Sequence, residues 1–124
     1  MWLYDSCIWV EWLLESRIGK SLKPEFLTIE TSIVPTLVQF ELQKWGAREL
    51  GETETARLLA LTTTCTVIPL DTAIAIEAAA LAQTHSLHSA DAIIYATAML
   101  AGATLVTCDA HFATLPRVKY FAKP

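Results

Sequence analysis

Residues 89–112 read SADAIIYATAMLAGATLVTCDAHF, and this stretch indicates the fold of the chain. Its first part predicts a helix over residues 89–101, because nearly every side chain is apolar and Gly102 can end the helix. The β-branched and apolar residues 104–107 predict a strand, and Asp109 follows two residues later. A helix that leads through one glycine into a short apolar strand is typical of proteins in which helices alternate with parallel strands.

The rest of the chain continues this alternation. Further strands are expected at residues 2–4, 32–34, 64–70 and 118–121. Further helices are expected at residues 6–15, 35–48, 52–62 and 71–83, with a basic loop at 17–23, a short helix opened by Pro24 and a turn or helix at Phe112. No repeat or linker divides the sequence, so we expect residues 1–124 to form a single α/β domain. The parallel sheet should be covered by helices on both faces, with the site beyond the carboxyl ends of its strands.

The composition is that of an ordered globular protein, with 53% apolar and 18% charged residues among 124. The longest apolar stretch, residues 92–101, is too short to cross a membrane. The amino terminus carries no basic segment before Asp5 and does not resemble a signal peptide. Three widely spaced cysteines indicate a reduced environment and no disulfide framework. We therefore expect a cytoplasmic protein.

Four acidic residues are candidates for one site. Asp5 directly follows the first expected strand and Asp109 follows the fourth, so both belong at the carboxyl edge of the sheet. Asp91 lies near the start of an otherwise apolar helix, and Glu41 lies within an expected helix. Each acid alone has an ordinary explanation as a helix cap, a turn residue or a surface acid. Only the combination points to a function.

This combination resembles the PIN domain family, and within it the VapC-type toxins. The resemblance rests on an apolar strand leading into Asp5-Ser6, a helix carrying Glu41, Ser89-Ala90-Asp91-Ala92 at a helix start, and residues 103–112. It covers nearly the whole chain. It implies a three-layer α/β/α sandwich with a central, mostly parallel sheet, and a metal-dependent endoribonuclease that is the toxin of a toxin–antitoxin pair.

The resemblance assigns both catalysis and metal binding to Asp5, Glu41, Asp91 and Asp109. It gives Ser6 and Thr107 a supporting role toward the metal or the phosphate. Carboxylate oxygens suit Mg²⁺, with Mn²⁺ as the alternative. Converging carboxylates repel one another unless a cation lies among them. The expected reaction is hydrolysis of an RNA phosphodiester by metal-activated water, without a covalent intermediate.

The net charge of −4 argues, taken alone, against a nucleic-acid partner. However, thirteen acids oppose nine bases, and setting the four site acids aside leaves equal numbers of each. Arg17, Lys20 and Lys23 of the expected basic loop are candidate RNA contacts, and a solvated loop is the alternative. The resemblance also implies a homodimer that a cognate antitoxin holds inactive. Trp9 and Trp12, three residues apart, suit either the core or such an interface.

Two positions depart from the family pattern: Cys7 stands where Asn is common, and Cys108 where a basic residue is frequent. A zinc site built from Cys108 and His111, completed by Cys7, His85 or His88, is disfavoured because no Cys-x-x-Cys pair is present. A Cys–His nucleophile pair has no local support. Cys65 is expected in the core.

Other functions remain open at this point. One is a catalytically silent PIN module that binds RNA or a protein partner. Another is a small-molecule hydrolase on a similar sheet, which would need a nucleophile or a glycine-rich phosphate loop that the four glycines do not provide. Phosphoryl transfer through Asp5 is disfavoured because Asp5-Ser6-Cys7 lacks a second acid.

Overall fold

The computed structural model describes residues 1–26 and 29–124, except for the side chains of residues 23, 25 and 26. Within this part of the chain, five strands form one sheet in the order β3-β2-β1-β4-β5, and all neighbouring strands run parallel. The strands are β1 (Trp2–Tyr4), β2 (Ile33–Pro35), β3 (Thr66–Ile68), β4 (Thr104–Thr107) and β5 (Val118–Tyr120). The predicted parallel sheet is confirmed.

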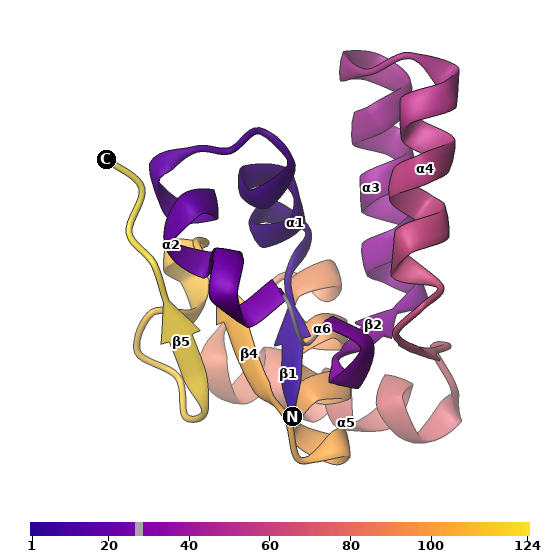
Figure 1. Cartoon of the computed structure of the whole chain (residues 1–124). Coiled ribbons are helices and arrows are strands. Elements are labelled where there is room, and N and C mark those ends of the chain that lie inside the picture. The colour runs from indigo at the N-terminus through magenta and orange to yellow at the C-terminus, as the bar shows by residue number, and fades with distance from the viewer. Residues whose placement is uncertain (27–28) are drawn as a thin grey trace.

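The helices form the outer layers of the molecule. They are α1 (Ser6–Leu13), α2 (Arg17–Phe26), α3 (Thr36–Glu49), α4 (Glu52–Thr62), α5 (Thr72–His85) and α6 (Ser89–Ala101), with short 3₁₀ turns η1 (Ile29–Thr31) and η2 (Ala110–Phe112). Helices α1 and α2 lie on one side of the sheet and α5 and α6 on the other, while α3 and α4 form an upright hairpin (Figure 1). The expected α/β/α sandwich is therefore confirmed. Among the described residues, no helix combines the length and the apolar character that crossing a bilayer requires.

The central strands β1 and β4 determine where the site can form. Leu3, Leu105 and Val106 are fully buried, because helices cover both faces of these strands. Tyr4 pairs with Val106, so the two strands end side by side. The backbone N–H of Asp5 continues the ladder by donating to Val106 O at 3.0 Å. The residues that follow β1 and β4 therefore meet at one edge of the sheet.

The predicted basic loop at residues 17–23 is wrong, because this segment is the first part of α2. The Ser16 Oγ accepts a hydrogen bond from Gly19 N at 3.1 Å, which caps the start of the helix. Ile18 and Leu22, four residues apart, are both buried and give α2 one apolar face. The helical spacing of these two apolar residues therefore outweighed the basic residues Arg17, Lys20 and Lys23 of the same segment.

Gly19 and Pro24 were misleading signals in the sequence. A Cβ atom at Gly19 would overlap the carbonyl of Glu11, so glycine is needed for the close approach of α2 to α1. Pro24 was expected to open a helix, but it lies inside α2. A glycine that permits helix packing looks the same in a sequence as a glycine that ends a helix.

The remaining elements agree with the prediction to within about two residues at each end. Helix α1 ends at Leu13, and Glu15 adopts a left-handed conformation with φ of 51°. Strand β3 is shorter than expected, because Thr64 and Cys65 belong to the turn after α4 and donate backbone hydrogen bonds to Leu61 O and Thr62 O. None of these differences moves a candidate site residue.

Candidate active site

A cleft opens at the carboxyl edge of the sheet, where β1 and β4 end. Asp5 precedes α1, Glu41 lies on α3, Asp91 lies in the first turn of α6, and Asp109 lies between β4 and η2. The side chains that line the cleft come from Asp5, Ser6, Cys7, Glu41, Asp91, Cys108, Asp109, Ala110 and Lys123. The structure thus brings all four predicted acids together from distant parts of the sequence.

Asp5 is the most buried of these acids, with 5% of its surface exposed. Its Oδ1 accepts a hydrogen bond from Ser6 N, and its Oδ2 accepts one from Thr107 Oγ1, both at 2.8 Å. Burial raises the pKa of Asp5, the Thr107 and Ser6 hydrogen bonds lower it, and the negative charges of Asp109 and Asp91 raise it. Both oxygens are therefore held in place by neutral donors inside a cluster of like charge.

Thr107 links two of the acids directly. It is fully buried at the end of β4, and its hydroxyl oxygen accepts a hydrogen bond from Asp109 N at 3.0 Å while donating to Asp5. Ser6 donates its backbone N–H to Asp5, and its side chain partly offsets the burial that raises the pKa of Glu41. The two predicted supporting residues therefore lie where they can orient the carboxylates.

Glu41 closes the cleft from the side of α3. Its Oε1 is buried and has no hydrogen-bond partner among the residues that the structure describes. Burial, followed by the negative charge of Asp5, raises the pKa of Glu41 to about 7. A buried carboxylate oxygen without a donor is a costly arrangement unless a cation or a proton occupies the position beside it.

Asp91 and Asp109 form the outer part of the cleft together with His111. The Nδ1 of His111 lies 3.3 Å from Asp91 Oδ2 and 3.2 Å from Asp109 Oδ1. The three residues each place one possible ligand atom within 4.8 Å of the others. Burial and Asp109 raise the pKa of Asp91, and His111 lowers it. In the sequence, His111 was a candidate for a zinc site and not for this carboxylate site, although it lies two residues after Asp109.

The donor set fits a hard divalent cation. Four carboxylates line one cleft, and Lys123 is the single basic residue among the described residues that line it. Burial raises the pKa values of Asp5, Glu41 and Asp91, and the neighbouring carboxylates raise them further, as expected for acids that converge in a partly buried cleft. Oxygen-rich sites of this kind suit Mg²⁺ or Mn²⁺ rather than zinc.

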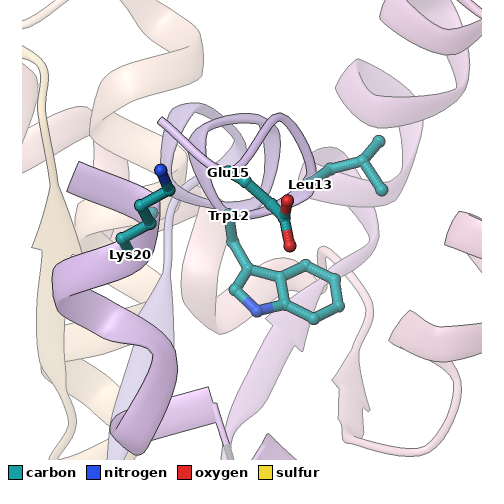
Figure 2. Close-up of a pocket in the computed structure, with 5 residues that line it drawn as sticks. Trp12, Leu13, Glu15 and Lys20 are labelled. Carbon is teal, nitrogen blue, oxygen red and sulfur yellow. The ribbon is translucent and has the colours of Figure 1, made fainter. Parts of the chain in front are cut away.

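The predicted RNA contacts lie elsewhere on the surface. Arg17 lines a hollow together with Phe121 and Pro124. Lys20 lines another hollow beside Trp12 and near Leu13 and Glu15 (Figure 2). Neither residue lines the acidic cleft, and the side chain of Lys23 lies outside the described part of the structure. An RNA contact by Arg17 or Lys20 stays a prediction.

Lys123 was missed in the sequence analysis. It follows β5 near the end of the chain and lines both the acidic cleft and an adjoining hollow beside Trp45. Its position gives the cleft a positive charge from a segment that had no predicted role. Only the path of the chain after β5 shows this, since Lys123 is fourteen residues from Asp109 in the sequence.

Comparisons with known proteins agree with this architecture. The PIN domain family matches residues 3–118, whereas no curated protein matches the chain significantly. A solved toxin-antitoxin complex from Klebsiella pneumoniae contains a similar chain, with 24% identity and a TM-score of 0.82, over 99% of this chain and 100% of that one. VapBC2 from Rickettsia felis, bound to a DNA fragment from its promoter, gives 17% identity and a TM-score of 0.76, over 98% and 97%. FitAcB from Neisseria gonorrhoeae is 22% identical, with a TM-score of 0.71, over 95% of this chain and 96% of that one.

Proposed function

The chain belongs to the PIN domain family, and from that premise we propose that it is a metal-dependent endoribonuclease acting as the toxin of a toxin–antitoxin pair. The observation that carries the proposal is the cleft at the carboxyl edge of the sheet, where four carboxylates converge. The buried Glu41 oxygen supports it further, because that oxygen has no donor among the described residues. The likeness in fold to chains from toxin–antitoxin complexes supports the biological setting.

In this proposal Asp5, Glu41, Asp91 and Asp109 hold Mg²⁺, with Mn²⁺ as the alternative. The bound cation would activate the attacking water and stabilise the leaving oxygen of an RNA phosphodiester. Asp5 acts as a fixed ligand, because Ser6 and Thr107 hold its two oxygens at 2.8 Å. Such fixed positions lower the cost of reorganisation during the reaction.

Two further residues have roles in this proposal. Glu41, with a pKa raised to about 7, carries a proton in part of the molecules at neutral pH and gives it up when a cation binds. Lys123 lines the cleft and offers a positive charge to the phosphate backbone of RNA. Arg17, Lys20 and Lys23 stay candidates for contacts farther along the RNA.

We also propose that residues 1–124 act as one cytoplasmic domain, that the protein forms a homodimer, and that a cognate antitoxin inhibits it. The likeness in fold to a chain of the toxin-antitoxin complex from Klebsiella pneumoniae supports the antitoxin proposal. Size-exclusion chromatography with light scattering tests the dimer, and a monomer at micromolar concentration would contradict it. Loss of the RNase activity when the antitoxin is added, at a fixed stoichiometry, tests the inhibition.

The test of the activity is cleavage of total cellular RNA by protein purified without antitoxin, with the new RNA ends mapped. We expect discrete ends in Mg²⁺ or Mn²⁺ that disappear with EDTA and in the Asp5→Asn variant. If native RNA is not cleaved although metal binding is measured directly, the chain is instead a catalytically silent module that binds RNA or a protein partner.

A further inference from the structure

Two thiols lie next to each other within the acidic cleft. Cys7 is in the first turn of α1, Cys108 directly follows β4, and both line the cleft. The backbone N–H of Cys108 donates to Cys7 Sγ at 3.3 Å, which holds the Cys7 sulfur against the backbone of Cys108. This proximity follows from the parallel pairing of Tyr4 with Val106, because that pairing makes β1 and β4 end side by side.

The Cys7 sulfur is part of the hydrogen-bond network that holds Asp5. Its Sγ lies 3.7 Å from Asp5 Oδ2 and 3.6 Å from Thr107 Oγ1. A chemical change at this sulfur therefore acts on the most buried acid of the site. The third cysteine, Cys65, is different, because it lies outside the cleft and its thiol donates to Ile29 O at 3.2 Å.

We propose that Cys7 and Cys108 are a thiol modification site that reacts with low-molecular-weight disulfides, such as glutathione disulfide, to form an intramolecular disulfide that weakens metal binding in the cleft. A disulfide requires the two Cα atoms to lie about 4.4–6.8 Å apart. The Cys7 sulfur already contacts the backbone nitrogen of Cys108 at 3.3 Å, which is compatible with this reach. The effect on activity rests on the proposed nuclease function, but disulfide formation does not.

The chemistry consists of two thiol–disulfide exchanges. Cys7 is the more exposed thiol and reacts first: a bond forms between its sulfur and one glutathione, and the other glutathione leaves as a thiol with the Cys7 proton. Cys108 then attacks the Cys7 sulfur, and the second glutathione leaves as a thiol with the Cys108 proton. Two protein thiols are thereby oxidised, and one glutathione disulfide is reduced to two glutathione thiols.

The disulfide should disturb the cation site in two ways. The Cys7 sulfur would lose the hydrogen with which it contacts Asp5. The new bond would also join the first turn of α1 to the connection after β4, which carries Asp109. Partners that orient metal ligands typically alter metal affinity by about 10–100-fold when removed, and we expect a loss of about tenfold. By linkage, a bound cation should shift the thiol–disulfide equilibrium toward the reduced form.

The experiment compares reduced protein with protein treated with glutathione disulfide, using Mn²⁺ as the probe. We expect the treated protein to lose two of its three thiols, to yield a Cys7–Cys108 peptide on mass spectrometry, and to bind Mn²⁺ about tenfold more weakly by calorimetry. Dithiothreitol should restore the affinity. Cys65→Ser should behave like the wild type, and the Mn²⁺ affinity of Cys7→Ser should not respond to glutathione disulfide. Cys108→Ser should stop at a glutathione adduct on Cys7 and form no intramolecular disulfide.

Three outcomes would overturn the inference. They are the survival of both thiols, a stable glutathione adduct on Cys7 with Cys108 still free, or a disulfide that leaves Mn²⁺ affinity unchanged. None of these readouts uses RNA. A reduced protein that binds Mn²⁺ but cleaves no RNA would contradict the proposed nuclease alone, and the thiol inference would still be decided by the three outcomes.

Discussion

The acidic cleft has two walls that differ in how the protein compensates their charge. The buried wall consists of Asp5, which is 5% exposed, and Glu41, whose Oε1 is buried without a partner among the described residues. The open wall consists of Asp91, Asp109 and His111, whose side chains are 20%, 34% and 61% exposed. On the open wall, His111 Nδ1 lies close to both carboxylates, and water can solvate them.

This difference shows which wall depends more on a cation. Ser6 and Thr107 orient the Asp5 carboxylate on the buried wall through hydrogen bonds. Both donors are neutral, so they do not neutralise its negative charge. A buried carboxylate that lacks a counter-charge is destabilising, whereas an exposed one is not. Substitutions on the buried wall should therefore have the larger effects on metal affinity and on the stability of the metal-free protein. Substitutions on the open wall should have smaller effects on both.

The largest expected loss of activity and metal affinity comes from Asp5→Asn, which removes a carboxylate from the buried wall. Asparagine keeps the shape of the side chain and is also a good N-cap, so the fold should persist. Losing a direct ligand should lower RNase activity by more than about a hundredfold, and Mn²⁺ affinity should fall with it. The matched control is Asp71→Asn, which changes the exposed cap of α5. Full Mn²⁺ affinity in Asp5→Asn would contradict the site assignment.

The second expected effect is a pH dependence of stability that originates on the buried wall. The folded protein raises the pKa of Glu41 from its usual 4.5 to about 7, so it holds this proton more tightly than the unfolded chain does. Without metal, the free energy of unfolding should therefore decrease as the pH rises from about 4.5 to about 7 and then level off. Thermal unfolding in EDTA across this range measures the effect.

Two variants and one addition sharpen this test. Glu41→Gln should flatten the decrease, while Glu49→Gln, exposed at the end of the same helix, should not. Saturating Mg²⁺ should remove most of the decrease in the wild type, because the cation replaces the proton. A metal-free protein that is equally stable at both ends of the range would show that the buried wall carries no uncompensated charge.

A smaller effect is expected from His111→Gln on the open wall. The backbone N–H of residue 111 still donates to Asp109 Oδ1 in this variant, so only the contact of the imidazole with the two carboxylates is lost. Mn²⁺ affinity should fall by about tenfold, the lower limit for partners that orient ligands. His85→Gln is the control, because His85 packs against Tyr95 and does not line the cleft. A loss of Mn²⁺ affinity as large as that of Asp5→Asn would show that metal binding depends equally on both walls.

The smallest effect is expected for Lys123→Gln, which leaves both walls intact. Removing one phosphate contact should lower the slope of log affinity against log salt concentration by about one for RNA. Lys44→Gln, exposed on α3, should leave the slope unchanged. If Arg17→Gln and Lys20→Gln reduce the slope while Lys123→Gln does not, RNA lies along α2 and not beside the chain end.

The alternation of strands and helices, and the meeting of the four acids, could be predicted because they depend on local patterns and on the direction of parallel strands. Helix α2 could not be predicted in this way, since the role of Gly19 depends on the backbone of α1. Lys123 was missed for a similar reason, because its position beside the acids depends on the path of the chain after β5. His111 could have been added to the site, since it follows Asp109 by two residues and lies in η2.

The hydrogen bond between Thr107 and Asp5 joins residues 102 positions apart. Because synthesis runs from the amino terminus, Asp5 leaves the ribosome long before Thr107 and Asp109 do. The site can therefore assemble only after β4 has been synthesised and has paired with β1. For the proposed nuclease, this order of assembly would delay RNA cleavage until both strands are present.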